Sequence, residues 1–242
     1  MLDQRLKLGS LFAGIGGLDL GFERAGFRVC WQVEIDTYAR RVLQKNFPMA
    51  SLYEDVCAFP PLGANVNVDV LAAGFPCQDI SLSGKGEGLE GEQSGLFFQV
   101  IRVARELRPR GIVLENVSTL CARGLGVVLG ELASLGYDAE WHCIPAASVG
   151  ALHIRDRVFV IGVLSDSDSE RKQSREAKWK DAENAWKSSG REEFGFWDIE
   201  PRLGRVADGV PNRIHRNRCL GNSVVPQVAE LVAQRTIELL AQ

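Results

Sequence analysis

The chain has 242 residues, of which 45% are hydrophobic and 24% are charged, so we expect one substantial core with room for a small appended unit. Its six cysteines form no C-x-x-C pair and have no metal-ligand spacing with the three histidines, which argues against a disulfide framework or a metal site and indicates reduced thiols in a cytoplasmic protein. No apolar run reaches membrane length, and the net charge of −3 neither supports nor excludes a nucleic-acid partner, because the local charge distribution decides such binding.

A glycine-rich turn follows the first predicted strand. Residues 6–12 predict this strand, and residues 13–22 then form a turn that opens a helix ending near Gly26. A strand, a glycine turn and a helix N-terminus form a nucleotide-type cradle, because glycine lets a ligand approach the backbone. The dinucleotide fingerprint G-x-G-x-x-G is broken by Asp19 at the third glycine position, so a simple structural turn is an equal alternative for this motif alone.

Acidic side chains recur after the next predicted elements. Residues 28–33 predict a strand that ends in Glu34, Ile35 and Asp36, and a helix over 37–46 precedes Asp55. A carboxylate after the second strand of such a unit accepts hydrogen bonds from ribose hydroxyls. Ile35 could lie against an adenine face, and Asp55 could accept from an exocyclic amine. Each acid alone is typical of a protein surface, but their recurrence favours a cofactor that carries a nucleoside.

A cysteine follows the most buried predicted strand. The apolar run 68–73 predicts that strand, and Gly74, Phe75 and Pro76 lead from it to Cys77. Chemistry in an open parallel sheet lies beyond the carboxyl ends of the strands, so Cys77 stands where a nucleophile would be placed, although a buried cysteine is more often a packing residue. The polar, glycine-rich residues 78–95 suit a mobile flap.

The second half of the chain repeats this pattern. Helices are predicted over 95–107, 125–135 and 226–240, and strands over 111–117, 137–145 and 153–162. Glu115 and Asn116 stand at the carboxyl end of one strand. Arg155 and Arg157 stand at the start of another, where alternation sends both side chains to one face. They are either solvated edge charges or a grip for a phosphate or a base carbonyl.

Together, these motifs resemble the DNA (cytosine-5) methyltransferase family over residues 8–163 and about 200–235. The matching motifs, in the order of the family, are 11–17 (LFAGIGG), 34–36 (EID), Asp55, 74–78 (GFPCQ), 115–117 (ENV), Arg155 with Arg157, and 221–224 (GNSV). The resemblance implies an α/β fold with a doubly wound, mostly parallel sheet of the Rossmann-like class I methyltransferase type and a small second lobe. It implies a catalytic domain of residues 1–163 plus 219–242 and a reduced target-recognition region over 164–218.

The resemblance also implies a reaction, the transfer of a methyl group from S-adenosylmethionine to C5 of cytosine in double-stranded DNA. Cys77 would add to C6 of a cytosine that is flipped out of the duplex, and Glu115 would hold or protonate N3. Asn116 would brace that strand end, Arg155 would contact the cytosine carbonyl, and Arg157 would brace the site or the flap. These five residues are the predicted catalytic set.

Two further sets of residues complete the expected site. By the resemblance, the residues expected to bind S-adenosylmethionine are Phe12, Gly14, Gly16, Glu34, Ile35, Asp55, Val56, Pro76, Leu96, Asn222 and Val224. From the polar flap and the basic stretch that follows it in the chain, those expected to bind DNA are Gln78, Ser81, Ser83, Lys85, Arg202, Arg205, Arg213 and Arg216, and a solvated charged loop is the alternative for the arginines. The helix over 226–240 would return to pack beside the first strand.

Two departures from the family pattern stand out. His153 replaces the usual Gln before the two arginines, and the interval 164–218 is short, so we expect a short recognition sequence. An RNA cytosine-5 methyltransferase on the same scaffold and a non-catalytic DNA-binding relative are the alternatives, although the second would be expected to lack Cys77 or Glu115. The expected partners are double-stranded DNA and, as one candidate, a cognate restriction endonuclease. We expect a monomer with neither a metal nor a membrane partner.

Overall fold

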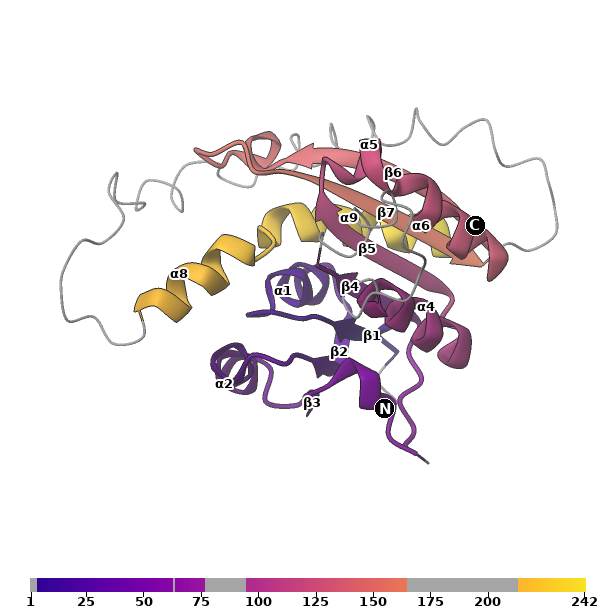
Figure 1. Ribbon diagram of the computed structural model, residues 1–242, viewed down its shortest axis with the longest axis horizontal. Helices are drawn as coiled ribbons and strands as arrows, with labels where there is room; N and C mark the ends of the chain where they lie inside the picture. Colours follow the sequence, from indigo (N-terminus) through magenta and orange to yellow (C-terminus); the bar gives the residue numbers. More distant parts are fainter. Residues whose placement is uncertain (1–3, 63, 77–94, 165–212) are drawn as a thin grey trace.

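The computed structural model describes residues 4–62, 64–76, 95–164 and 213–242, with the backbone alone for 213–217. Within these ranges a seven-stranded sheet forms the centre of the molecule, in the order β3-β2-β1-β4-β5-β7-β6 (Figure 1). The strands are β1 (Lys7–Leu11), β2 (Arg28–Val33), β3 (Ser51–Tyr53), β4 (Val70–Gly74), β5 (Gly111–Val117), β6 (Tyr137–Pro145) and β7 (Asp156–Leu164). The helices are α1 (Gly17–Arg24), α2 (Thr37–Asn46), α4 (Gly95–Leu107), α5 (Leu120–Arg123), α6 (Leu125–Ser134), α8 (Arg213–Asn222) and α9 (Pro226–Leu240), with 3₁₀ turns η1 (Val56–Ala58) and η3 (Ala146–Val149).

The sheet is mostly parallel and doubly wound, which confirms the predicted fold class. Strands β1 to β5 pair in parallel, whereas β7 runs antiparallel to both β5 and β6. From β1 the chain proceeds outward to β2 and β3, and from β4 it proceeds in the opposite direction to β5. The strand order therefore reverses between β1 and β4, and a sheet of this kind binds its ligands in the crevice at the carboxyl ends of those two strands.

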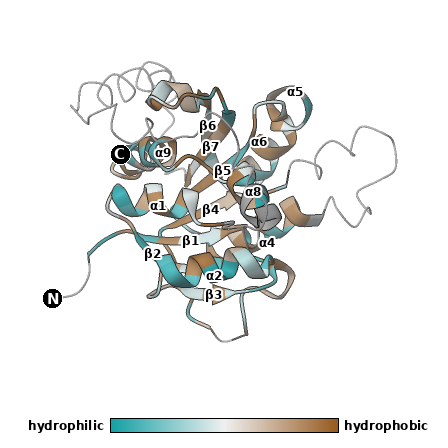
Figure 2. Cartoon of the chain, turned by 90° about the vertical axis from the view of Figure 1, so that its left-hand side faces the viewer, coloured by the Kyte–Doolittle hydropathy of each residue, from teal (hydrophilic) through white to brown (hydrophobic). Residues whose placement is uncertain are grey.

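Helices cover both faces of the sheet. Figure 2 shows α1 and α9 on one side of the strands and α4 and α6 on the other, with brown hydrophobic residues turned toward the sheet. Two groups of buried side chains fill the two layers: one contains Phe97 of α4 and Leu132 of α6, and the other contains Phe22 of α1 and Val232 of α9. Strands buried on both faces explain why the run 70–73 is entirely apolar.

A buried ion pair fastens α9 to the far edge of the sheet. Arg235 is completely buried, and its Nε and Nη2 atoms donate to the two carboxylate oxygens of Glu140 on β6, at 2.8 and 2.9 Å. Its Nη1 atom donates to Glu238, at 2.9 Å. This bidentate pair fixes how α9 is rotated about its own axis, because a buried guanidinium needs a partner for each of its donor groups.

Several elements differ from the expectations. The helices at 37–46, 95–107 and 226–240 occur as predicted, but β3, α5 and α8 were not anticipated. Helix α8 crosses the predicted domain boundary at residue 218. Helix α9 packs mainly against α1 and also reaches β5 and β7, and its buried side chains share one hydrophobic layer with Leu8 of β1.

Candidate active site

The glycine turn begins the crevice. It leaves β1 at Phe12 with φ of 55°, and Gly14 and Gly16 follow with φ of 56° and 84°. Positive φ favours glycine, and at Gly16 a side chain would also meet the Phe47 ring at 2.5 Å. At Gly14 a Cβ atom would meet nothing within 4 Å, so open space lies in front of the turn. The turn therefore presents backbone to an open crevice at the N-terminus of α1.

Glu34 joins the glycine turn to the end of β2. Its Oε2 atom accepts from the backbone N–H of Gly14 at 2.7 Å, and its Oε1 atom accepts from the N–H of Asp36 at 2.8 Å. A carboxylate has about four lone-pair positions, so these two bonds leave capacity for a hydroxyl donor. The predicted ribose-binding residue thus also holds the turn in place, a role that sequence reasoning did not anticipate.

The neighbouring residues at this edge have separate roles. Ile35 is a large hydrophobic side chain that is 66% exposed beside Glu34. Asp36 caps α2 by accepting from two backbone N–H groups, and its other oxygen pairs with Arg218 of α8 at 3.0 Å. Asp55 caps η1 by accepting from the backbone N–H of Cys57 at 2.8 Å.

Not every residue of the predicted cofactor set has a side chain on the crevice. Val56 is 6% exposed and packs in the core, whereas Pro76 is exposed, and Leu96 at the start of α4 is partly buried against the same core. The side chain of Val56 therefore could not contact a ligand directly. Only its backbone carbonyl has a described polar contact, at 2.9 Å from the Arg102 guanidinium.

The segment after α8 closes the crevice against α1. A Cβ atom at Gly17 would lie 2.3 Å from the Val224 carbonyl oxygen and 2.5 Å from the Ser223 hydroxyl. Only glycine therefore permits this approach. The narrow cavity that results is lined by Ser10, Phe12, Ala13, Gly14, Gly17, Leu18, Gly74, Glu115, Asn222, Ser223 and Val224. Sequence reasoning missed the role of Gly17, although the paired glycines at 16 and 17 were a visible signal.

Glu115 and Arg157 form the polar centre of the site. Glu115 stands opposite Gly74 at the end of β4, and its Oε1 atom lies 3.1 Å from Arg157 Nε. Burial raises the pKa of the Glu115 carboxyl, and the charges of Arg157 and Arg155 partly offset that effect. A Cβ atom at Gly74 would lie 3.2 Å from Glu115 Oε2, so a larger residue there would crowd the carboxylate.

Asn116 fixes the backbone that leads to Cys77. Its amide nitrogen donates to the carbonyl oxygen of Phe75 at 3.0 Å, and its amide oxygen accepts from the N–H of Val117 at 2.8 Å. The side chain is 3% exposed, so both bonds are shielded from water. Cys77 itself lies outside the described residues, as do the predicted DNA-binding residues Gln78, Ser81, Ser83, Lys85, Arg202 and Arg205.

Arg155 lies just before β7 and not within it, so strand alternation is not the reason that Arg155 and Arg157 lie near one another. Its φ is 30°, and its Nη1 atom donates to the carbonyl of Gly221 at 2.7 Å. Nε and Nη2 are buried without a hydrogen-bond partner among the described residues. Burial, and secondly the Arg157 charge, lower the guanidinium pKa. Both arginines line a cavity of about 700 Å³ together with Arg24 and Leu220.

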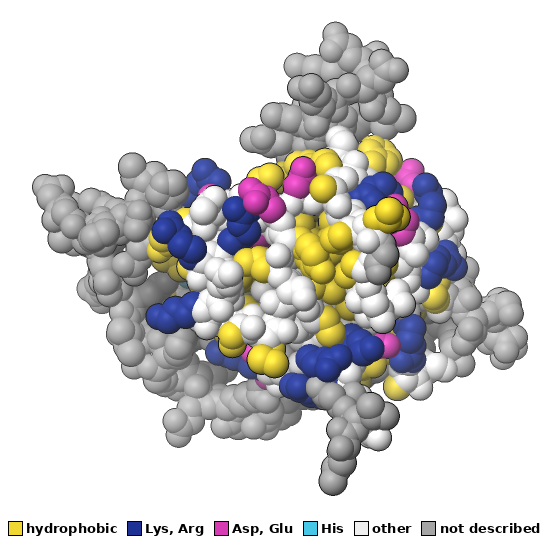
Figure 3. Space-filling model, turned by 90° about the horizontal axis from the view of Figure 1, so that it is seen from below, with side chains coloured by type: hydrophobic (Ala, Val, Ile, Leu, Met, Phe, Trp, Pro, Cys, Tyr) yellow, Lys and Arg dark blue, Asp and Glu magenta, His cyan; other side chains and the backbone are white. Residues whose placement is uncertain are grey.

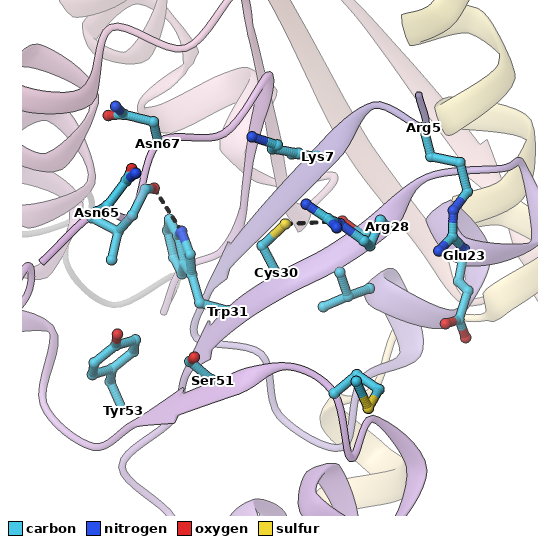
Figure 4. A pocket seen from close by; sticks show the side chains of 13 residues that line it. Arg5, Lys7, Glu23, Arg28, Cys30, Trp31, Ser51, Tyr53, Asn65 and Asn67 are labelled. Atoms are coloured by element: carbon cyan, nitrogen blue, oxygen red, sulfur yellow. Dashed lines mark hydrogen bonds between the residues drawn. The ribbon is translucent and has the colours of Figure 1, made fainter. Parts of the chain in front are cut away.

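Other parts of the described chain offer less to a reaction. Arg213 and Arg216 belong to α8, but their side chains are not described. A third cavity lies at the amino ends of β1 to β3, where Lys7, Arg28, Trp31 and Tyr53 line it (Figure 4). This cavity is at the opposite end of the strands from Glu115. Figure 3, a view from below Figure 1, shows Lys and Arg side chains around the margin of the face in view and hydrophobic ones near its centre.

Two searches of the described residues bear on metals and membranes. No three His, Cys, Asp or Glu side chains among them come together as a metal ion would require. Nor does any helix in these ranges combine the length and apolar character needed to cross a membrane.

Comparison with known proteins identifies the family. The model of the C-5 cytosine-specific DNA methylases matches residues 6–206. The chain belongs to this family. Its relatives include the type II methyltransferase M.CviJI of Paramecium bursaria Chlorella virus IL3A, which is 35% identical over 161 residues that cover 66% of this chain and 44% of that protein. M.Bsp6I of Bacillus sp. (strain RFL6) is 36% identical over 170 residues, covering 65% and 52%.

Solved structures of methylases agree with this assignment. A DNA modification methyltransferase encoded within an E. coli prophage, itself described as putative, has a TM-score of 0.55 at 31% identity and covers 66% of this chain and 47% of that one. S. pombe Dnmt2 methyltransferase has a TM-score of 0.66 at 13% identity and covers 98% and 100%, a likeness of fold. The chain spans about half the length of the curated relatives that it matches.

Proposed function

We propose that this methylase transfers a methyl group from S-adenosylmethionine to C5 of cytosine in double-stranded DNA. The observation that carries the proposal is the pairing of buried Glu115 with partly buried Arg157 at the carboxyl end of β5, beside the glycine turn and the 74–76 segment that leads to Cys77. Cytosine C5 is a weak nucleophile, so the reaction needs a group that adds to the ring and an acid that accepts the resulting charge.

The thiol of Cys77 would add to C6 of the base, which makes C5 nucleophilic. The Glu115 carboxyl would donate a proton to N3 as this bond forms, and its raised pKa favours the protonated form that this step needs. Arg157 would hold Glu115 in one orientation through their 3.1 Å contact. After methyl transfer, water would remove the C5 proton, the N3 proton would return to Glu115 and the thiolate would leave.

The other two predicted catalytic residues, Asn116 and Arg155, would orient the backbone near Cys77 and the substrate. Asn116 would fix the Phe75 carbonyl, and hence the direction in which the chain approaches Cys77. Arg155 has two buried donor atoms without partners among the described residues and lines the cavity of about 700 Å³. We therefore propose that it donates hydrogen bonds to the substrate, at a base carbonyl or a phosphate. The target atom is inaccessible inside a duplex, so the base must be flipped out, which costs a few kcal/mol.

The crevice between β1 and β4 fits S-adenosylmethionine, which supplies the methyl group. Open space in front of Gly14, spare lone pairs on Glu34 and the exposed side chain of Ile35 suit the sugar and adenine. The lining of the narrow cavity includes both Gly14 and Glu115, so the methionine end would lie between the glycine turn and the proposed base site. Asp55 is exposed beside this edge and would accept from the adenine amine.

A covalent trap tests the proposal. Duplex DNA containing 5-fluorocytosine, incubated with protein and S-adenosylmethionine carrying a radiolabelled methyl group, should give a complex that survives denaturing electrophoresis, because fluorine at C5 cannot be removed as a proton. Cys77→Ser should abolish the complex. Glu115→Gln should slow its formation by about 10²- to 10⁴-fold, the usual range for a general acid.

The matched control is Glu106→Gln, which makes the same chemical change at an exposed side chain of α4. It should leave the rate within a factor of about two, because its ion pair with Arg102 contributes little at a surface. Labelling of a 5-fluorocytosine RNA but not of the DNA would contradict the DNA substrate. Labelling of neither by the folded protein would contradict the proposed reaction.

We also assign the recognition of the target sequence to residues 164–218, of which 165–212 lie outside the described residues. The type II methyltransferases among the relatives support a role beside a cognate restriction endonuclease. Mapping the methylated positions of genomic DNA after exposure to the protein tests the expectation of a short recognition sequence, and a long, strictly defined site would contradict it.

A further inference from the structure

Two exposed cysteines lie side by side outside the proposed active site. Cys121 belongs to α5 and Cys143 to β6, and their sulfur atoms are 3.6 Å apart although the residues are 22 positions apart in the sequence. Both residues are exposed to solvent. Neither has a part in the proposed methyl transfer.

The topology of the sheet brings the two thiols together. Helix α5 begins three residues after Val117, the last residue of β5, and β7 separates β5 from β6. A contact between α5 and β6 therefore spans β7. On β6, Cys143 has the same parity as Tyr137 and Ala139, which pack in the core layer that α6 covers. Both sulfurs thus lie on the α6 face of the sheet, away from the α9 face that carries Glu140.

We propose that Cys121 and Cys143 are a redox modification site, which forms a reversible intramolecular disulfide when the protein meets a low-molecular-weight disulfide such as oxidised glutathione. A disulfide needs a sulfur–sulfur distance of about 2.05 Å, so the two atoms must approach by about 1.5 Å. Rotation of two exposed side chains supplies this movement, because neither is held in a packed core. The oxidant reaches both sulfurs from solvent.

The exchange needs no reactant other than the small disulfide. One protein thiol loses its proton and attacks the small disulfide, which forms a mixed disulfide and releases one thiolate. The second protein thiol then loses its proton and attacks the protein sulfur of that mixed disulfide, which releases the second small thiol. Two protein S–H groups are oxidised to one S–S bond, and one small disulfide is reduced to two thiols.

The surroundings of the pair set the pH dependence of the exchange. Partial burial of the Cys143 thiol raises its pKa to about 11, with further contributions from Cys121 and Asp156, so little of this thiol is ionised at neutral pH. The reaction should be faster at pH 9 than at pH 7. The new bond would close a loop that contains α5 and α6 and would tie the chain just after β5 to β6.

The experiment uses the full chain carrying Cys77→Ser, which removes the thiol proposed as the nucleophile. After treatment with oxidised glutathione, mass spectrometry of unreduced peptides should show a 121–143 linkage as the main disulfide. The melting temperature should rise by about 5 °C, because a closed loop restricts the unfolded chain, and dithiothreitol should reverse the change.

Single variants separate this site from general thiol oxidation. Cys121→Ser and Cys143→Ser should each leave one thiol that stops at the glutathione mixed disulfide, with no rise in melting temperature. Cys57→Ser, which removes a different exposed thiol, should retain the linkage. Glutathione attached separately to both Cys121 and Cys143, or disulfides that join either one mainly to another cysteine, would overturn the proposal.

Discussion

Asp19 is a buried carboxyl group that should destabilise this fold at neutral pH. It lies in the first turn of α1, is completely buried, and has a weak hydrogen bond at 3.4 Å from the Ser10 hydroxyl. Burial raises its pKa from 3.8 to about 6, although hydrogen bonds oppose the shift. The folded state therefore binds this proton more tightly than the unfolded state does. The stability that the protonated group contributes is complete below pH 3.8 and is lost as the pH rises through about 6.

The size of the effect follows from the shift. Two pKa units at 1.36 kcal/mol each amount to about 3 kcal/mol of unfolding free energy lost between pH 4 and pH 7. Asp19→Asn keeps the shape and the acceptor oxygen but cannot ionise. We therefore expect the variant to be more stable than the wild type by up to about 3 kcal/mol at pH 7, and to lose this advantage near pH 4.

Urea denaturation between pH 4 and pH 8 measures the difference. The control is Glu106→Gln on α4, an exposed residue that is not among the groups acting on Asp19, and it should change stability by less than about 0.5 kcal/mol at every pH. The reasoning would be refuted if the difference between Asp19→Asn and the wild type did not change with pH. It would equally be refuted if the stability advantage of Asp19→Asn over the wild type were smaller at pH 7 than at pH 4.

Three further substitutions test the contacts of the crevice and of the sheet edge. Gly17→Ala should displace the 223–224 segment, because its Cβ atom would lie 2.3 Å from a backbone oxygen, and isothermal titration calorimetry should show weaker S-adenosylmethionine binding. Arg235→Met should cost about 3–5 kcal/mol in urea denaturation, because it leaves the buried carboxylate of Glu140 without its partner. Arg157→Met should raise the pKa of Glu115 further, so that the alkaline limb of the kcat/KM profile moves to higher pH.

Each of these substitutions has a control or an outcome that would count against it. Gly126→Ala places a methyl group in open space on α6 and should leave cofactor binding unchanged. The double variant Arg235→Met with Glu140→Gln should recover part of the lost stability, and no recovery would mean that lost packing explains the cost. If the alkaline limb of the kcat/KM profile of Arg157→Met stayed in place or moved to lower pH, the electrostatic role given to Arg157 would be contradicted.

The sequence identified the elements whose signal is local. The amphipathic patterns at 37–46, 95–107 and 226–240 each contain enough turns to define a helix, and the apolar run before Gly74 defined β4. Strand β3 has only three residues and α5 only four, so neither carries a period that can be recognised. Helix α8 was missed for another reason, since its many charged residues have no apolar stripe.

In the candidate site, the residue types were predictable from the sequence and their contacts were not. The residue types that suit the chemistry, Glu115, Asn116 and Arg157, were predictable because each stands near one end of a predicted strand. The bond from Arg155 to the Gly221 carbonyl was not predictable, because it depends on a backbone φ of 30° just before β7 and joins positions far apart in the chain. The bond from Gly14 to Glu34 and the contact of Gly17 with the 223–224 segment join positions far apart in the chain.

By itself, then, the sequence determined the order of the longer strands and helices, the placing of polar residues at the strand ends and the family. It could do so because side-chain period and glycine or proline position act over a few residues. Only the tertiary structure decided the partners: Glu115 with Arg157, Asn116 with Phe75, and Cys121 with Cys143. The first and third of these contacts depend on how β7 and β6 add antiparallel to a parallel sheet, and the second depends on the register of β4 with β5, and no local pattern encodes either arrangement.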